Sequence, residues 1–477
     1  MARVSSKHSD SVFYGYSNIN ITVLLWALLS QIWPQPVTCR STLEFLPGFH
    51  GRLPFQLQTG YVGVGESSEV EVFYYFIESE NNPQEDPLLI WFSGGPGCTS
   101  FVGLASEIGP IAFVDQEYNG SLPSLVLRPQ SWTKAASIIF PDLPVGAGFS
   151  YAKTEAANQS GDWVVAHHAY QFLRKWLMDH PEYLSHKVYV CGDSYAGIHI
   201  PAFVQEISYG NENGVQPLIN IQGYILGNPI TTRLEVNYQI TFAHGMGLIS
   251  DELHESLQKN CKAQYANMDP KNLLCLRDFQ LFQELTAEID HAMILEPAFC
   301  GYDNLRVLSP RNSLMKRSLT QKVKANNFPS KCRRLGYTQE TYWANNDHVR
   351  KALHVRKGTV GCWKRCNSDI NYKYGINSSF YIHANLSAKG YRSLIYSGDH
   401  DMVCPFSATQ AWIRSLNYSV VDDWRPWHVN GQVAGYTRTY SNHMTFATMK
   451  GAGHTAPEFK PDECLAMLKR WISNEPL

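Results

Sequence analysis

Residues 187–197 read Lys-Val-Tyr-Val-Cys-Gly-Asp-Ser-Tyr-Ala-Gly and carry the clearest information about the fold. The apolar run before Gly192 is short and rich in valine, which is typical of a buried strand. Helix-forming residues begin within a few positions of Ser194. The sequence therefore places Ser194 in a tight turn between a strand and a helix, with Gly192 and Ala196 two positions away on either side.

This turn resembles the nucleophile elbow of α/β-hydrolases, in which a strained strand-to-helix turn exposes a serine hydroxyl at the edge of a sheet. Small residues flank such a serine because the turn leaves no room for larger side chains. The strict G-x-S-x-G pattern is not met, since Ala196 stands in place of the second glycine. An ordinary N-capping serine is the alternative reading of the same residues.

The segments around the elbow alternate between strand and helix patterns. Helical periodicity covers residues 162–180 and 461–474, and short apolar runs predict strands at 69–77, 88–92, 137–140, 221–226, 394–396 and 444–449. Buried short strands separated by helices indicate a mostly parallel sheet covered on both faces. The predicted class is therefore α/β, and 44% hydrophobic residues suffice for a large core.

The middle of the chain follows a different pattern. Residues 229–344 read as helices, cysteines and a basic, polar stretch, with no convincing buried strand. We expect a helical cap with a basic linker there, inserted between a first core part (39–228) and a second core part (345–477). No internal repeat or low-complexity tract suggests another organisation.

The first 38 residues have the pattern of a signal peptide. Arg3 and Lys7 precede an apolar stretch at 21–29, which is too short to span a bilayer. A buried helix is the alternative, and no clean cleavage site is visible. The signal peptide predicts entry into the secretory pathway, and no later stretch approaches the length of a membrane span.

Composition agrees with a secreted or luminal protein. The chain has 40 basic and 42 acidic residues, a net charge of −2, which argues against nucleic-acid binding. Eleven cysteines suit an oxidising compartment, and no Cys/His quartet with zinc spacing accompanies them. Beyond the leader, N-glycosylation sequons begin at Asn119, Asn158, Asn377, Asn385 and Asn417.

An acid and a histidine should follow the elbow serine along the chain. The run 394–396 leads into a loop that contains Asp399 and Asp401, and either could be the acid. Asp401 is favoured because it lies three positions after Gly398 and four before Pro405, the spacing usual for hydrolase acids. The run 444–449 leads into a glycine-rich loop with His454. We expect Ser194 as nucleophile, Asp401 as orienting acid and His454 as general base and acid.

A glycine-rich turn after the run 88–92 supplies a candidate oxyanion hole. It reads Ser-Gly-Gly-Pro-Gly-Cys from Ser93 to Cys98, and the backbone N–H groups of Gly95 and Tyr195 are the expected donors. A phosphate-binding loop is the alternative, but the P-loop lysine and the G-x-G-x-x-G spacing are both missing.

Together the segment 91–98, the elbow, the loop 398–405 and the Gly453-His454 pair resemble the serine carboxypeptidase family over nearly the whole chain after the leader. The resemblance implies an α/β-hydrolase fold with a helical cap, glycosylation, and no metal or organic cofactor. It also implies a cap linker that some members lose by cleavage, here near 311–324, and leaves Cys362 without a partner. The implied disulfides are Cys98–Cys366, Cys261–Cys275 and Cys300–Cys332.

Two positions distinguish the expected reaction within this family. Its carboxypeptidases usually have asparagine where this chain has Ser93 and glutamate where it has Asp193, and those side chains help to hold a peptide's C-terminal carboxylate. Both are shorter here, while Glu107 of the same network remains. The expected substrate-binding residues are Trp91, Ser93, Gly94, Glu107 and Asp193.

The same positions, with the segments 399–402, 422–427 and 435–438, resemble the plant serine carboxypeptidase-like acyltransferases. Members of that group move an acyl unit from a 1-O-β-glucose ester to an alcohol acceptor. The resemblance therefore implies a glucose ester and an alcohol as small-molecule partners, and delivery to the vacuole or outside the cell. The alternatives are a carboxypeptidase, a lyase on the same fold, and a catalytically silent glycan-bearing binding or chaperone protein.

Overall fold

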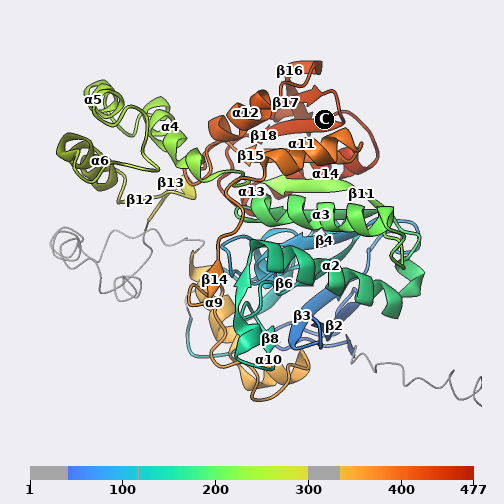
Figure 1. Cartoon of the computed structure of the whole chain (residues 1–477). Helices are drawn as coiled ribbons and strands as arrows, with labels where there is room; N and C mark the ends of the chain where they lie inside the picture. Colours follow the sequence, from blue (N-terminus) through green and yellow to red (C-terminus); the bar gives the residue numbers. More distant parts are fainter. Residues whose placement is uncertain (1–40, 117, 299–333) are drawn as a thin grey trace, which may run out of the picture. The chain divides into compact units, whose positions relative to one another are not determined.

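The computed structural model of the protein describes residues 41–116, 118–298 and 334–477 (Figure 1). The expected signal peptide, the pair Cys300–Cys332 and the basic linker lie outside the described residues. Within them, no helix is long and apolar enough to cross a membrane.

A twelve-stranded sheet forms the centre of the described chain (Figure 1). Its six middle strands, from β7 to β18, run parallel, and antiparallel strands flank them at both ends. Strand β8 (Tyr151–Ala152) pairs with β3 off the main path. The strand order is β1 (Ser41–Leu43), β2 (Leu57–Val64), β3 (Val70–Ile77), β7 (Ser137–Pro141), β4 (Leu88–Phe92), β10 (Val188–Asp193), β11 (Ile221–Gly227), β15 (Arg392–Gly398), β18 (Met444–Met449), β17 (Gln432–Tyr440) and β16 (Val420–Val429).

The predicted α/β class and all seven predicted strands, including the one before Gly192, are confirmed, but strands at the sheet's two ends were not predicted. Strand β2 contains two glycines, which interrupt its alternating pattern. Strand β16 carries Asp422, Asp423, Arg425 and Pro426 and is largely exposed. Charged residues and proline are common on edge strands, and they weaken the apolar signal used for prediction.

Helices cover both faces of the sheet, and β3 shows how the two cores are divided. Its residues Phe73, Tyr75 and Ile77 point into one apolar core, and Val72 and Tyr74 point into the other. The second core lies under α2 (Asp162–Asp179), α3 (Ala196–Glu212), α11 (Phe380–Ala388) and α12 (Phe406–Ser415), and the first under α9 (Arg334–Ala344), α10 (Asp347–Ala352), α13 (Ala456–Phe459) and α14 (Pro461–Ile472).

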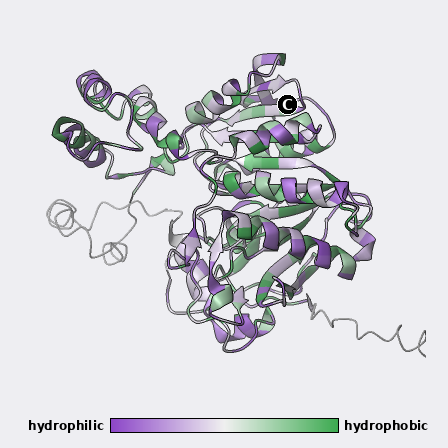
Figure 2. Cartoon of the chain, in the orientation of Figure 1, coloured by the Kyte–Doolittle hydropathy of each residue, from purple (hydrophilic) through white to green (hydrophobic). Residues whose placement is uncertain are grey.

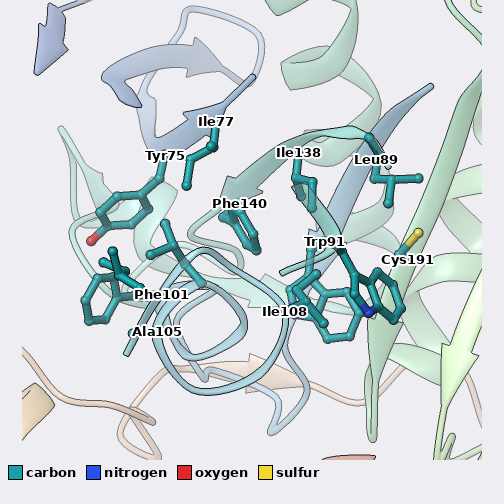
Figure 3. Packing of buried hydrophobic residues seen from close by; sticks show 14 of the residues in the cluster. Tyr75, Ile77, Leu89, Trp91, Phe101, Ala105, Ile108, Ile138, Phe140 and Cys191 are labelled. Atoms are coloured by element: carbon teal, nitrogen blue, oxygen red, sulfur yellow. The ribbon is translucent and has the colours of Figure 1, made fainter. Parts of the chain in front are cut away.

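The first core also contains the short helix η1 (Gly103–Glu107), which follows the glycine-rich turn and leads to β5 (Ile111–Phe113) of a separate two-stranded sheet. Figure 3 shows Phe101, Ala105 and Ile108 from this segment packed against Trp91 and Tyr75 of the strands. Outward-facing residues of α2 and α3 are more hydrophilic, so each of these helices carries both colours in Figure 2. The packing of Phe101, Ala105 and Ile108 against the strands fixes the glycine-rich turn at the carboxyl end of β4.

The segment after β11 is mainly helical, as expected. It contains η5 (Arg233–Tyr238), α4 (Gln239–Gly245), α5 (Asp251–Cys261) and α6 (Leu273–Leu285). Helices α4, α5 and α6 share a small apolar core, which also includes Ile294 and Met402. The expectation of no buried strand is wrong in part. Strands β12 (Ile289–Asp290) and β13 (Met293–Pro297) form a hairpin in which Met293 and Ile294 are buried. A hairpin this short leaves almost no periodic pattern in the sequence.

Candidate active site

Ser194 lies at the turn between β10 and α3 in a left-handed backbone conformation, with φ of 57°. Its N–H donates to the carbonyl of Gly227 at 2.9 Å, and its own carbonyl accepts from the N–H groups of Gly197 and Ile230. A non-glycine residue in this conformation is strained, and these bonds from the end of β11 hold it there. The Ser194 side chain is partly exposed, which suits a nucleophile.

Close packing explains which residues the turn accepts. A Cβ atom at Gly192 would lie 2.2 Å from the Phe92 carbonyl oxygen, and one at Gly197 would lie 2.5 Å from the Ile230 carbonyl oxygen. Both contacts are with backbone, which cannot move aside. Position 196 tolerates the methyl group of alanine, so the departure from the strict motif does not disturb the elbow.

Asp401, not Asp399, contacts the histidine. Its Oδ2 lies 2.7 Å from Nδ1 of His454, and its side chain is completely buried. The Val403 N–H donates to the other oxygen at 2.7 Å. Asp399 instead accepts a hydrogen bond from the Gly451 N–H at 2.7 Å, so its carboxylate supports the neighbouring loop.

Asn228 is a site residue that sequence reasoning missed. Its Nδ2 donates to Asp401 Oδ2 at 2.8 Å, and its Oδ1 accepts from the Gly398 N–H at 3.2 Å. It follows β11 directly, next in the sheet to β15, so the end of a parallel strand was the signal that could have identified it. Three hydrogen bonds thus hold the Asp401 carboxylate: Asn228, Val403 and His454.

The electrostatics of His454 suit a general base paired with an acid. Burial lowers the pKa of His454, but the charge and hydrogen bond of Asp401 outweigh it and leave the pKa above its ordinary value. Asp193 and Asp290 contribute in the same direction. Because Nδ1 is bonded to Asp401, the remaining ring nitrogen, Nε2, is left for the reaction.

The hairpin β12–β13 holds the loops of both residues through its backbone. The carbonyl of Ala292 accepts from the His454 N–H at 2.7 Å, and the carbonyl of His291 accepts from the Met402 N–H at 2.9 Å. The approach is close enough that a Cβ atom at Gly453 would lie 2.3 Å from the Ala292 oxygen. A feature missing from the sequence prediction therefore positions the acid and the histidine.

The glycine-rich turn packs directly on the nucleophile. A Cβ atom at Gly94 would lie 2.6 Å from Ser194 Cβ, and Gly95 has a φ of 115°, which favours glycine. The Gly94 N–H donates to Asp193 Oδ1 at 3.3 Å. Among the described residues, the N–H groups of Gly95 and Tyr195 have no hydrogen-bond partner, so both are available to a substrate oxyanion.

The other expected substrate-binding residues are buried around this turn. Trp91 is completely buried, and its Nε1 donates to Ser93 Oγ at 3.3 Å, so its indole supports Ser93 from beneath. Burial raises the pKa of Asp193 to about 6, against the opposing charge of His454. Burial also raises the pKa of Glu107 well above its usual range, with a further contribution from Asp193, and neither Glu107 oxygen has a hydrogen-bond partner among the described residues.

Two of the three implied disulfides lie within the described residues, and both are present: Cys98–Cys366 and Cys261–Cys275. The first ties the glycine-rich turn to the segment after α10, where the Asn367 N–H also donates to the Gly97 carbonyl at 2.9 Å. Cys362 is an exposed free thiol, as the resemblance left it, and three further free thiols are buried: Cys191, Cys404 and Cys464.

In the part of the chain that the structure describes, one set of metal-ligating side chains comes together, namely Asp401, Cys404 and His454. Two of its three members already bond each other as the acid and the histidine. Of the five sequon asparagines, Asn385 is half-buried in α11 and the other four are exposed, at positions 119, 158, 377 and 417. Glycosylation at these positions stays a prediction.

Comparison with known proteins agrees with this geometry. Residues 47–474 match the family model described as serine carboxypeptidase. Serine carboxypeptidase-like 19 of Arabidopsis thaliana is 50% identical over 468 residues, which cover 96% of this chain and 100% of that protein. Serine carboxypeptidase-like 10 of the same plant is 52% identical over 451 residues, covering 94% and 98%.

A solved structure shows the fold. The crystal structure of a prohormone-processing carboxypeptidase from Saccharomyces cerevisiae superposes with a TM-score of 0.69 at 19% identity, covering 88% of this chain and 92% of that chain. At that identity the likeness concerns the α/β-hydrolase fold alone. The family model, however, spans the elbow, the Asp401 loop and His454 in one continuous match. The chain belongs to the serine carboxypeptidase family.

Proposed function

We propose that the protein is an acyltransferase that moves an acyl group from a 1-O-β-glucose ester to an alcohol through an acyl-enzyme on Ser194. The Ser194 hydroxyl attacks the ester carbonyl while His454 Nε2 takes its proton and passes it to the departing glucose oxygen. The acceptor alcohol then repeats the sequence in reverse, giving its proton to His454 as it attacks the acyl-enzyme.

The surrounding groups have distinct parts in this scheme. Asp401 holds His454 in the required tautomer and stabilises the imidazolium that forms. The N–H groups of Gly95 and Tyr195 bind the oxyanion of each tetrahedral intermediate. Water competes with the acceptor at every turnover, so transfer requires that the alcohol be bound in attack geometry and that water be kept out.

The short side chains of Ser93 and Asp193 support this choice of substrate. Asp193 is buried beside the nucleophile with its short side chain bonded to the Gly94 N–H, and Ser93 accepts a hydrogen bond from Trp91. Above pH 6 the Asp193 carboxylate is mostly ionised. The shorter side chains at positions 93 and 193 reach less far toward a peptide's C-terminal carboxylate than asparagine and glutamate would, whereas a sugar ester can donate hydroxyl hydrogen bonds to the Asp193 oxygens.

The carboxypeptidase alternative keeps one specific support. Glu107 is buried with both oxygens unpartnered among the described residues. Burial raises the pKa of its carboxyl well above its usual range, which favours the protonated form that could donate to a peptide carboxylate. Of the three side chains expected to hold a peptide carboxylate, one is therefore present and two are shortened.

For the location of the protein, we propose the secretory pathway and then the vacuole or the extracellular space. The two described disulfides are compatible with such an oxidising compartment.

The test compares donors on one enzyme preparation. The glycosylated protein is incubated with aromatic 1-O-β-glucose esters plus alcohol acceptors, with a peptide that has a free C-terminus, and with the same peptide amidated. We expect transfer from the glucose esters, little cleavage of the free peptide and none of the amidated one. Ser194→Ala should remove transfer while leaving the thermal midpoint unchanged. A clear preference for the free peptide would establish the carboxypeptidase instead.

A further inference from the structure

Asp162, the first residue of α2, has a completely buried side chain that accepts hydrogen bonds from two separate segments. Its Oδ1 accepts from the hydroxyls of Tyr195 at 3.0 Å and Tyr372 at 2.7 Å. Its Oδ2 accepts from the N–H groups of Gly375 at 2.7 Å and Ile376 at 2.8 Å. A carboxylate offers about four lone-pair directions, so this one is saturated.

The donors show that the carboxylate is not an ordinary helix cap. An aspartate in the first turn of a helix usually accepts from the free N–H groups of its own helix. All four donors to Asp162 come from outside α2: one from the turn that carries the nucleophile and three from residues 372–376. Asp162 therefore connects the start of α2 to the nucleophile turn and to residues 372–376.

The protonation states around Asp162 follow from its pKa. Burial raises the pKa of Asp162, but His199, 3.5 Å away, together with the hydrogen bonds of Tyr372 and the backbone, outweighs it and lowers the pKa to about 2. The carboxylate is thus ionised throughout the working pH range, and both tyrosine hydroxyls donate to it. The Tyr372 hydroxyl uses its only hydrogen in the bond to Asp162, so it can only accept a hydrogen bond from His199. His199 Nε2, 2.5 Å from that oxygen, must therefore carry a hydrogen and donate it.

Tyr195 connects this carboxylate to the reaction centre. Its N–H is the second oxyanion donor in the proposed mechanism, and its hydroxyl at the other end of the side chain is bonded to Asp162. Its ring also packs edge-on against those of His199 at 5.1 Å and Tyr374 at 5.9 Å between centroids. Because the Tyr195 hydroxyl is bonded and its ring is packed, the peptide between Ser194 and Tyr195 has little freedom to rotate.

The segment that supplies the other Asp162 donors also holds the first oxyanion donor. Cys366 forms a disulfide with Cys98, which lies in the glycine-rich turn three residues after Gly95. The same segment continues to Gly375 and Ile376, whose N–H groups donate to Asp162. Both N–H groups of the oxyanion hole are thereby held relative to one stretch of chain. An oxyanion hole needs this, because its donors must lie about 2.7–3.1 Å from one oxygen.

We propose that Asp162 is a positioning residue of the oxyanion hole, which acts by holding the Tyr195 side chain so that its backbone N–H stays directed at the tetrahedral intermediate. The inference rests on the proposed role of Ser194 as the nucleophile, but not on the identity of the acyl donor or acceptor. Among the described residues no Lys or Arg pairs with Asp162. His199 at 3.5 Å and the four hydrogen-bond donors stabilise the buried anion, which can therefore serve as a fixed anchor for the Tyr195 hydroxyl.

Two variants remove one hydroxyl each from the same carboxylate oxygen. Tyr195→Phe releases the residue that carries the oxyanion donor, and Tyr372→Phe is the matched control because it leaves the Tyr195–Asp162 bond in place. The probes are hydrolysis of 4-nitrophenyl acetate, inhibition by phenylboronic acid, which forms a tetrahedral adduct on serine, and the thermal midpoint. These probes do not depend on which glucose ester the enzyme uses.

Tyr195→Phe should lower kcat about 10-fold or more with little change in KM, since a removed oxyanion donor costs about 100- to 1,000-fold and here the donor is only misaligned. The affinity for phenylboronic acid should fall by a similar factor. Tyr372→Phe should lower the thermal midpoint comparably while kcat and boronate affinity stay within about 2-fold, because the oxyanion donors are unaffected. Asp162→Asn should reproduce the kcat and boronate losses, and combining it with Tyr195→Phe should add nothing further.

The inference is overturned if the two phenylalanine variants lose kcat and boronate affinity equally, or if Tyr195→Phe changes neither. Additive losses in the double variant would also overturn it, since they would show that Asp162 acts independently of Tyr195. A wild-type protein that neither hydrolyses the ester nor binds the boronate would instead refute the nucleophile assignment in the proposed function.

Discussion

The carbonyl oxygen of Ala292 accepts a hydrogen bond of 2.7 Å from the backbone N–H of His454. Ala292 belongs to the hairpin turn between β12 and β13, and His454 follows the last parallel strand of the sheet. The same turn holds Met402 beside the acid through the His291 carbonyl. The inserted segment therefore helps to position the loops that carry Asp401 and His454.

The hairpin also adds charge, which predicts a shift in pH dependence. Asp290 is one of the groups that raise the pKa of His454, after Asp401 and Asp193. Replacing it by asparagine removes a negative charge, so the His454 pKa should fall. Because the reaction needs neutral His454, the acidic limb of the kcat/KM profile should move to lower pH in Asp290→Asn. Asp269→Asn, at an exposed position on the same insertion, is the control and should leave the profile in place.

The two aspartates of the acid loop should respond very differently to amidation. Asp401→Asn leaves His454 in the wrong tautomer and should slow turnover by about four orders of magnitude. Asp399→Asn weakens contacts with the Gly451 N–H and the His400 ring, away from His454, and should cost far less. Steady-state rates with one ester substrate distinguish them, and a larger loss in Asp399→Asn would contradict the structural assignment.

Substrate choice should respond to the two shortened residues. The double change Ser93→Asn and Asp193→Glu restores longer polar side chains next to Glu107, so hydrolysis of free peptides should rise and glucose-ester transfer should fall. One charge-assisted hydrogen bond is worth about 1.5–3 kcal/mol, or roughly 10- to 150-fold in relative kcat/KM. Both substrates are measured at mildly acidic and neutral pH. An unchanged ratio would show that these two positions do not control the choice.

The two described disulfides should differ in their contribution to stability. Cys98–Cys366 spans 268 positions and Cys261–Cys275 spans 14. In the chain-entropy model, the loss of the disulfide that closes the long loop costs about 5.6 kcal/mol, and the loss of the one that closes the short loop costs about 3 kcal/mol. Unfolding of paired Cys→Ser variants in urea measures both values. The long-range pair should also affect turnover, because it anchors the oxyanion turn.

Much of this architecture could be predicted from the sequence because its strands are short, apolar and bounded by glycine. The run 88–92 coincides with β4, and the positions of Ser194, Asp401 and His454 followed from the strands that precede them. The edge strands β2 and β16 were missed because glycines or charges interrupt their apolar pattern. Local patterns work best where both faces of a strand are buried.

The supporting contacts could not be predicted in the same way. Asn228, Ala292 and Asp162 act through hydrogen bonds to residues far away in the sequence, and no local pattern marks them. For the acid, by contrast, the sequence already favoured Asp401 over Asp399 by its spacing, and the structure places Asp401 against His454 and Asp399 against the Gly451 N–H. The sequence indicates which strand ends carry the chemistry, but tertiary contacts decide which of the side chains there meet.

The order of the parallel strands has a consequence for how the protein is made. Asn228 and Asp401 are hydrogen-bonded at the ends of adjacent strands, yet 173 positions separate them along the chain. A nascent chain emerges with its N-terminal part first, so Ser194 and the oxyanion turn are synthesised long before their acid and base. In the proposed mechanism, Ser194 has no proton acceptor until β18 and the loop with His454 have folded. The proposed activity is therefore acquired only after the chain has been synthesised through His454.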